Sequence, residues 1–71
     1  MAISTSDLIW TAHNAMVARA QSERAKERAE REKLANADGD TTYEMYCYGN
    51  VGAYGAAARA YEICAAMLES L

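Results

Sequence analysis

One turn signal and the absence of proline constrain this fold more than any other feature of the sequence. Asn36-Ala37-Asp38-Gly39-Asp40 is a run of turn-forming residues between two long stretches with helical periodicity. Sixteen of the 71 residues are alanine, which has the highest helix propensity, and proline is absent. We therefore predict an all-α fold, a single domain spanning residues 1–71. It is an antiparallel helical hairpin with helix one at about 5–36, a turn at 37–40 and helix two at about 41–70.

Both helix starts carry capping signals. Ser4 and Asp7 fit a capping box at the start of helix one, with Ile3 and Leu8 placed as a hydrophobic staple around it. A second capping box, Thr41-Thr42-Tyr43-Glu44, is predicted to open helix two. These signals support two separate helices with defined starts.

The glycines predict where the helices end or bend. Gly39 suits the left-handed position just after the end of helix one. Gly49, Gly52 and Gly55 each cost a helix about 1 kcal/mol relative to alanine. Helix two is therefore expected to be kinked or broken near Gly49–Gly55, and the sequence leaves open whether it stays continuous or breaks into two helices.

Helix two carries apolar residues on two faces, each repeating at heptad spacing. The first seam is Tyr46, Asn50, Ala53, Ala57, Ala60, Cys64, Met67 and Leu71. The second seam is Tyr43, Cys47, Val51, Tyr54, Ala58, Tyr61, Ala65 and Leu68. Helix one offers one apolar stripe and can cover only one seam, so the other requires a partner. We expect a homo-oligomer, most simply a dimer that forms a helical bundle.

Small residues and tyrosines on helix two suggest where such partners bind. Gly52, Ala56, Ala60 and Cys64 are four residues apart and would let another backbone approach closely, although an alanine-rich helix has small residues everywhere. We predict this row as the self-association site. Five tyrosines could pack in the core with wet hydroxyl groups or form a binding face. The residues predicted to bind another protein are Tyr48, Asn50 and Tyr54.

No arrangement of residues in the sequence predicts catalysis, a metal or a cofactor. In a hairpin that turns near residue 38, His13 is expected at the level of Cys64, but no third group is evident to orient the histidine. The segment from residue 36 resembles a calcium loop only at its start, because Thr41 and Cys47 stand where glycine and glutamate are required. The glycine spacing matches neither a dinucleotide-binding motif nor a P-loop. We expect a protein that is not an enzyme and binds no cofactor.

Charge argues against nucleic acid and membranes as partners. Seven basic and ten acidic residues give a net charge of −3. Four arginines of helix one could face phosphates, namely Arg19, Arg24, Arg28 and Arg31. Glutamates lie between them and would repel the same phosphates. No apolar run is long enough to span a bilayer, and no secretory signal follows Met1. We expect a cytoplasmic protein with both cysteines reduced.

These observations favour a non-catalytic, self-associating module that binds another protein. The small size, the alanine and arginine content and the lack of catalytic groups suggest a small adaptor or inhibitor of a larger bacterial protein complex. A phage-type accessory protein, such as an inhibitor of a host defence system, is the specific form of this expectation. The alternative is a nucleic-acid-associated helper that uses the arginine-rich face of helix one.

Overall fold

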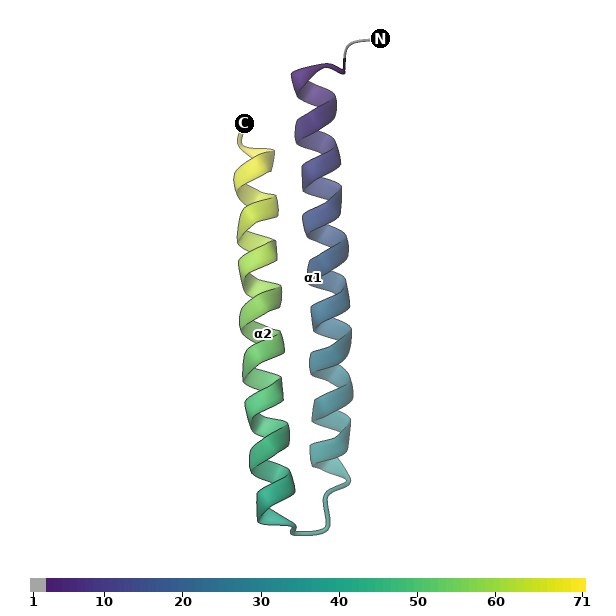
Figure 1. The fold of residues 1–71 in the computed structure, drawn as a ribbon, viewed down its shortest axis with the longest axis vertical. Helices are drawn as coiled ribbons and strands as arrows, with labels where there is room; N and C mark the ends of the chain where they lie inside the picture. The colour runs from purple at the N-terminus through teal and green to yellow at the C-terminus, as the bar shows by residue number, and fades with distance from the viewer. Residues whose placement is uncertain (1–2) are drawn as a thin grey trace.

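The computed structural model of the protein describes residues 3–71, which form two helices joined by a short turn. Helix α1 runs from Thr5 to Ala35 and helix α2 from Thr41 to Glu69. They lie side by side and antiparallel (Figure 1), and the molecule measures 58 × 19 × 13 Å. The predicted all-α hairpin is confirmed, with each helix ending one residue earlier than predicted. Residues 1 and 2, which the predicted domain included, lie outside the described residues.

Side-chain caps hold both helix starts. Ser4 caps α1 as predicted, because its hydroxyl oxygen accepts a hydrogen bond from the Asp7 backbone nitrogen at 3.1 Å. The cap of α2 is Asp40, not Thr41, and its carboxylate accepts from the Tyr43 backbone nitrogen at 3.1 Å. The prediction placed this cap one residue too late. Aspartate is at least as good a cap as threonine, and its negative charge also complements the positive end of the helix dipole.

Gly39 adopts the left-handed conformation but does not directly follow helix α1. The helix ends at Ala35 and is capped by Asn36, whose side-chain amide donates to the Glu32 carbonyl oxygen at 2.9 Å. Gly39 lies three residues beyond that cap, with a φ of 77°. The predicted conformation is confirmed and its predicted position is wrong. The reversal takes place within the loop, where a residue without a Cβ adopts a positive φ at little cost.

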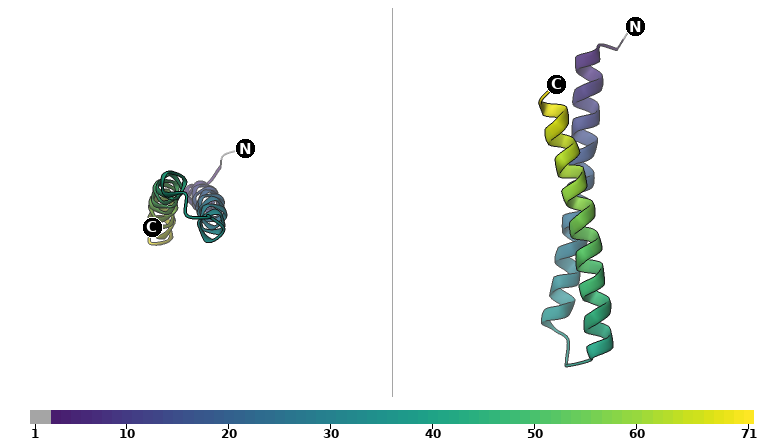
Figure 2. Two further views of the ribbon diagram at one scale, coloured as in Figure 1. Left: turned by 90° about the horizontal axis from the view of Figure 1, so that it is seen from below. Right: turned by 90° about the vertical axis from the view of Figure 1, so that its left-hand side faces the viewer.

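Helix α2 passes through its three glycines without interruption, so the predicted break does not occur. Residues 41–69 form one helix, and Figures 1 and 2 show a smooth curve with no sharp bend near Gly49–Gly55. Glycine lowers helix propensity but, unlike proline, keeps its N–H and therefore its bond to the preceding turn. The alanines around the glycines and the packing against α1 are enough to keep the helix continuous.

The core between the two helices is thin and made of small residues. Its buried apolar members are Ala20, Cys47, Val51, Ala58 and Ala65. Large apolar side chains are mostly outside it, including Ile3 and Leu8, so the predicted staple buries little. Viewed along its length, residues 3–71 form two helices with no further layer (Figure 2). Each helix therefore has one covered side.

Overpacking this thin core should destabilise the hairpin. Ala58 is fully buried against α1, so Ala58→Leu is expected to reduce the free energy of unfolding by about 1–3 kcal/mol, because no space exists for the extra carbons. The same substitution at exposed Ala66 is the control and should be close to neutral. Thermal unfolding followed by circular dichroism measures both. Equal midpoints for the two variants would show that α1 does not pack on the side of α2 that carries Ala58.

Candidate interaction surfaces

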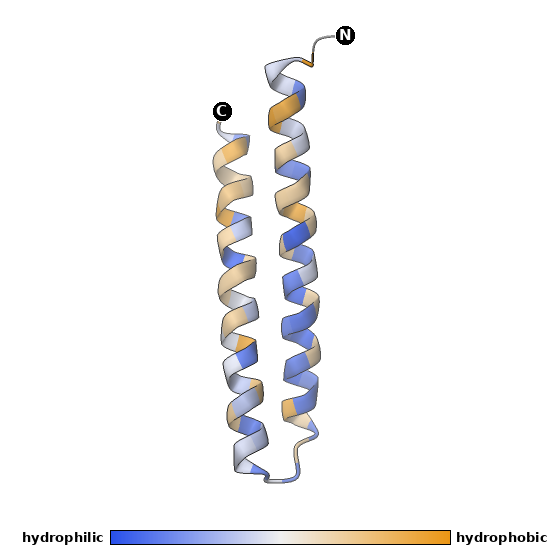
Figure 3. Cartoon of the chain, viewed as in Figure 1, coloured by the Kyte–Doolittle hydropathy of each residue, from blue (hydrophilic) through white to orange (hydrophobic). Residues whose placement is uncertain are grey.

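Helix α1 covers the second seam of α2 and leaves most of the first seam open. All four buried residues of α2 belong to the second seam: Cys47, Val51, Ala58 and Ala65. In the first seam, only Asn50 and Ala57 are half-buried and the other six residues are exposed. Figure 3 shows a strongly hydrophilic lower half of α1, whereas α2 is most hydrophobic in its upper half. The described part of the chain thus presents an apolar helix face that nothing covers.

The row of small residues predicted for self-association lies on the exposed part of α2. Gly52, Ala56, Ala60 and Cys64 are all exposed. Residues four apart on a helix turn by about 40°, so the row runs obliquely from the side opposite α1 into the first seam. The first seam and this row together form one continuous surface, which we call the open face.

One glycine of α2 lies against a side chain of α1, and two border open space. A Cβ atom on Gly55 would lie 2.6 Å from the Glu27 carboxylate, so this glycine makes room for a side chain of α1. A Cβ atom on Gly49 or Gly52 would meet nothing within 4 Å. The packing of the hairpin therefore gives no reason for these two residues, although each costs the helix about 1 kcal/mol.

An apolar groove lies at the C-terminal end of the open face, beside the first half of α1. Its volume is about 390 Å³, and both helices contribute to its wall. The lining residues are Ala12, Met16, Cys64, Met67, Leu68 and Leu71. Two methionines make such a surface adaptable, because an unbranched thioether side chain can fit partners of different shape.

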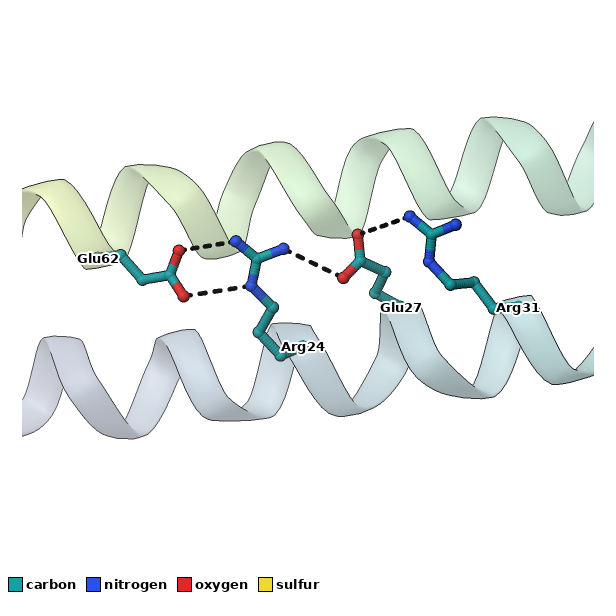
Figure 4. Close-up of polar contacts among 4 residues, drawn as sticks. All are labelled: Arg24, Glu27, Arg31 and Glu62. Carbon is teal, nitrogen blue, oxygen red and sulfur yellow. Dashed lines mark hydrogen bonds and ion pairs between the residues drawn. The ribbon is translucent and has the colours of Figure 1, made fainter.

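A network of ion pairs joins the helices on the other side of the hairpin (Figure 4). Arg24 binds the Glu62 carboxylate through two nitrogens, at 2.7 and 3.2 Å, and donates a further hydrogen bond to Glu27 at 3.1 Å. Arg31 lies 3.6 Å from the second oxygen of Glu27. The hydrogen bonds from Arg24 lower the pKa of Glu62. The pKa of Arg24 is raised, mainly by its hydrogen bonds to Glu62 and secondly by its bond to Glu27.

Two further basic residues of α1 lie over tyrosine rings of α2. The Arg19 guanidinium lies 5.9 Å from the centre of the Tyr61 ring, and the Lys26 ammonium lies 5.7 Å from that of Tyr54. These two tyrosines are half-buried with cations over their rings, as expected for core residues with wet edges. Much of the positive charge of α1 is therefore neutralised or stacked, which disfavours the arginine-rich face as a phosphate-binding surface.

Glu30 is a charged residue buried at the helix interface, and sequence reasoning did not single it out. It is 7% exposed, and one carboxylate oxygen accepts from Lys33 at 3.1 Å. The other oxygen is the single buried side-chain oxygen or nitrogen without a hydrogen-bond partner among residues 3–71. The bond from Lys33 lowers the pKa of Glu30, although burial opposes this change. No periodicity signals such a residue, because it sits within a run of alternating charges.

His13 contacts Glu69 and not Cys64, although Cys64 lies near the level predicted for it, in one groove with Ala12 and Met16. Nε2 of His13 lies 2.7 Å from the Glu69 carboxylate, whereas Cys64 lines the apolar groove beside Met16. Side chains lean toward the N-terminus of their own helix. In an antiparallel pair, the side chain of an α1 residue therefore meets a residue about one turn further along α2 than the one that is equally far from the turn. Both cysteines are free thiols, and Cys47 is buried.

The continuous helix separates the three residues predicted to bind a protein partner. Asn50 and Tyr54 are half-buried on the side toward α1, and Lys26 covers the Tyr54 ring. Tyr48 precedes Asn50 by two positions, which turns it by about 200° to the other side of α2. Its side chain is 65% exposed. Tyr48 is thus the one member of the predicted set that is fully available to another molecule.

Acid should destabilise the hairpin through its paired carboxylates. Glu30 and Glu62 have pKa values below their ordinary 4.5, so the stability that they contribute is present above pH 4.5 and is lost as the pH falls through the lower folded-state values. We expect the thermal midpoint to decrease below pH 4.5, and to decrease less in the double variant Glu30→Gln/Glu62→Gln. A parallel decrease in both proteins would assign the acid sensitivity to other carboxylates.

Within residues 3–71, no group of three or more histidine, cysteine, aspartate or glutamate side chains is arranged to hold a metal ion. In the same part of the chain, neither helix has an apolar stretch that could cross a membrane. Comparisons with protein-family models, curated proteins and solved structures found no match for this chain.

Proposed function

We propose that this protein is a non-catalytic, self-associating helical hairpin that binds a larger protein as a small adaptor or inhibitor. The observation that carries the proposal is the open face of α2, where Gly49 and Gly52 border empty space. Glycines that weaken a helix and serve no contact within it are explained if another backbone approaches them closely. Alanines and exposed methionines extend the same surface at both ends.

The charge distribution supports a protein partner over nucleic acid. Arg24 is bound by two carboxylates, Arg31 lies beside Glu27, and Arg19 stacks on Tyr61. Phosphate groups would have to compete with glutamates that are already in place. We therefore place the nucleic-acid-associated helper second, without an observation that favours it.

The biological setting proposed here follows from size and chemistry. A chain of 71 residues with a thin core has little room for an enclosed active site, but its helix faces are long enough to block or bridge surfaces of a larger bacterial complex. A phage-type accessory protein that inhibits a host defence system is one such use. A cytoplasmic location fits the two free cysteines, since thiols stay reduced there.

The first test concerns self-association. We expect a dimer or larger species at micromolar concentration, measured by sedimentation equilibrium. Ala60→Glu places a charge on the open face and should weaken association about tenfold or more, because a buried unpaired carboxylate costs more than 1.4 kcal/mol. Ala66→Glu adds the same charge at an exposed position that lines the Arg24 side of the hairpin, and is the control. A wild-type protein of 7.8 kDa at this concentration would contradict the proposal.

The second test concerns the larger partner. An exposed tyrosine is a typical hot-spot residue, so Tyr48→Ala should weaken partner binding by about 2 kcal/mol or more while leaving helix content unchanged. Arg28→Ala changes an exposed charge on α1 and should have a smaller effect. The measurement is quantitative binding to a protein that wild-type chain captures from host lysate. Loss of binding in the arginine variant alone would move the recognition surface to α1.

A further inference from the structure

The surface area of the hairpin indicates how much of it a second copy would cover. The chain exposes 5285 Å². A compact monomer of 7.8 kDa exposes about 4,400 Å², so the hairpin has an excess of about 900 Å². A stable protein interface buries about 800 Å² on each partner. The excess therefore matches the area that one copy loses when it forms a dimer.

We propose that two copies pack the first seams of their α2 helices against each other in antiparallel orientation around a two-fold axis. This arrangement rests on the proposed self-association and specifies its geometry. The first seam runs from Tyr46 to Leu71, and only one antiparallel register overlaps its full length. In that register, the axis passes midway between Ala57 and Ala60 of each helix.

The register pairs small residues in the centre and larger residues at the ends. Ala57 faces Ala60 of the second copy, and Ala53 faces Cys64 of the second copy. These short side chains allow the two helices to approach closely. At each end, Tyr46 faces Leu71 of the second copy, which lies two residues beyond the end of α2, so large side chains lie where the helices can diverge.

The apolar groove gives Tyr46 of the second copy a place to bind. Tyr46 is 65% exposed in the hairpin and has no role in its core. The antiparallel register places this ring against Leu71, at the groove that Met16 of α1 and Met67 of α2 also line. A volume of about 390 Å³ accommodates an aromatic ring, and thioether groups make favourable contacts with ring edges. Helix α1 thus contributes to the dimer contact.

Electrostatics favour the antiparallel orientation over a parallel one. Parallel α2 helices would place their dipoles side by side in the same direction. They would also bring the acidic turns of both copies together, each with Asp38, Asp40 and Glu44. The antiparallel arrangement opposes the dipoles and places these carboxylates at opposite ends of the assembly.

Disulfide formation by Ala53→Cys tests the register directly. Residues 53 and 64 of one helix are about 16 Å apart, beyond disulfide reach, so any bond between them must join two chains. Mild oxidation should convert most of this variant to a covalent dimer on a non-reducing gel. Wild-type protein should stay non-covalent, because its two Cys64 residues lie about 16 Å apart along the antiparallel helices. Tyr48→Cys, on the other side of α2, is the control and should not cross-link.

Each contrary result overturns a defined part of the proposal. A wild-type dimer linked through Cys64 would mean that the helices are parallel or that the antiparallel axis lies at Cys64, and either result overturns this register. A dimer in sedimentation that Ala53→Cys does not link would mean that another register or face is used. A monomer in sedimentation would overturn the self-association itself. Binding of a larger protein through Tyr48 is measured separately, so its failure leaves the dimer arrangement in place.

Discussion

A single helix can cover only one side of another, and this constraint shapes the whole molecule. Helix α2 is apolar around most of its circumference, while α1 has just one stripe to offer it. The second seam is buried and holds the hairpin together through alanines, a valine and a cysteine. The first seam, with the glycines beside it, stays open. The stability of the hairpin and the binding function proposed for it both follow from this unequal division.

Polar contacts set the alignment that the small core residues cannot set alone. Alanine side chains are too short to distinguish one helical register from the next. The Arg24–Glu62 and His13–Glu69 contacts join particular turns of the two helices, and Glu27 occupies the space that Gly55 leaves. Exposed pairs add little stability individually. Their direction and spacing nevertheless oppose a slip of one turn, which would separate several of them at once.

The same contacts give the hairpin two unlike sides. One carries the Arg24 network, where charges satisfy each other and leave little free potential for a charged ligand. The other carries the open face, where backbone and apolar atoms are accessible and no side chain of the hairpin competes with a partner. The proposed function therefore places binding on α2, with α1 as its support.

Local signals in the sequence predict the helices, the hairpin and the two seams. Alanine content, the absence of proline and the caps act within a few residues, so helix starts and ends were predictable to about one residue. Whether the glycines would break α2 was not predictable, because a break depends on whether packing compensates for the lower helix propensity of glycine, about 1 kcal/mol for each residue. Three outcomes became known only from the packing of the two helices: which seam is covered, that His13 reaches Glu69, and that Tyr48 is separated from Asn50 and Tyr54. These outcomes depend on the rotation of one helix against the other and on the lean of side chains across the interface, which no local pattern records.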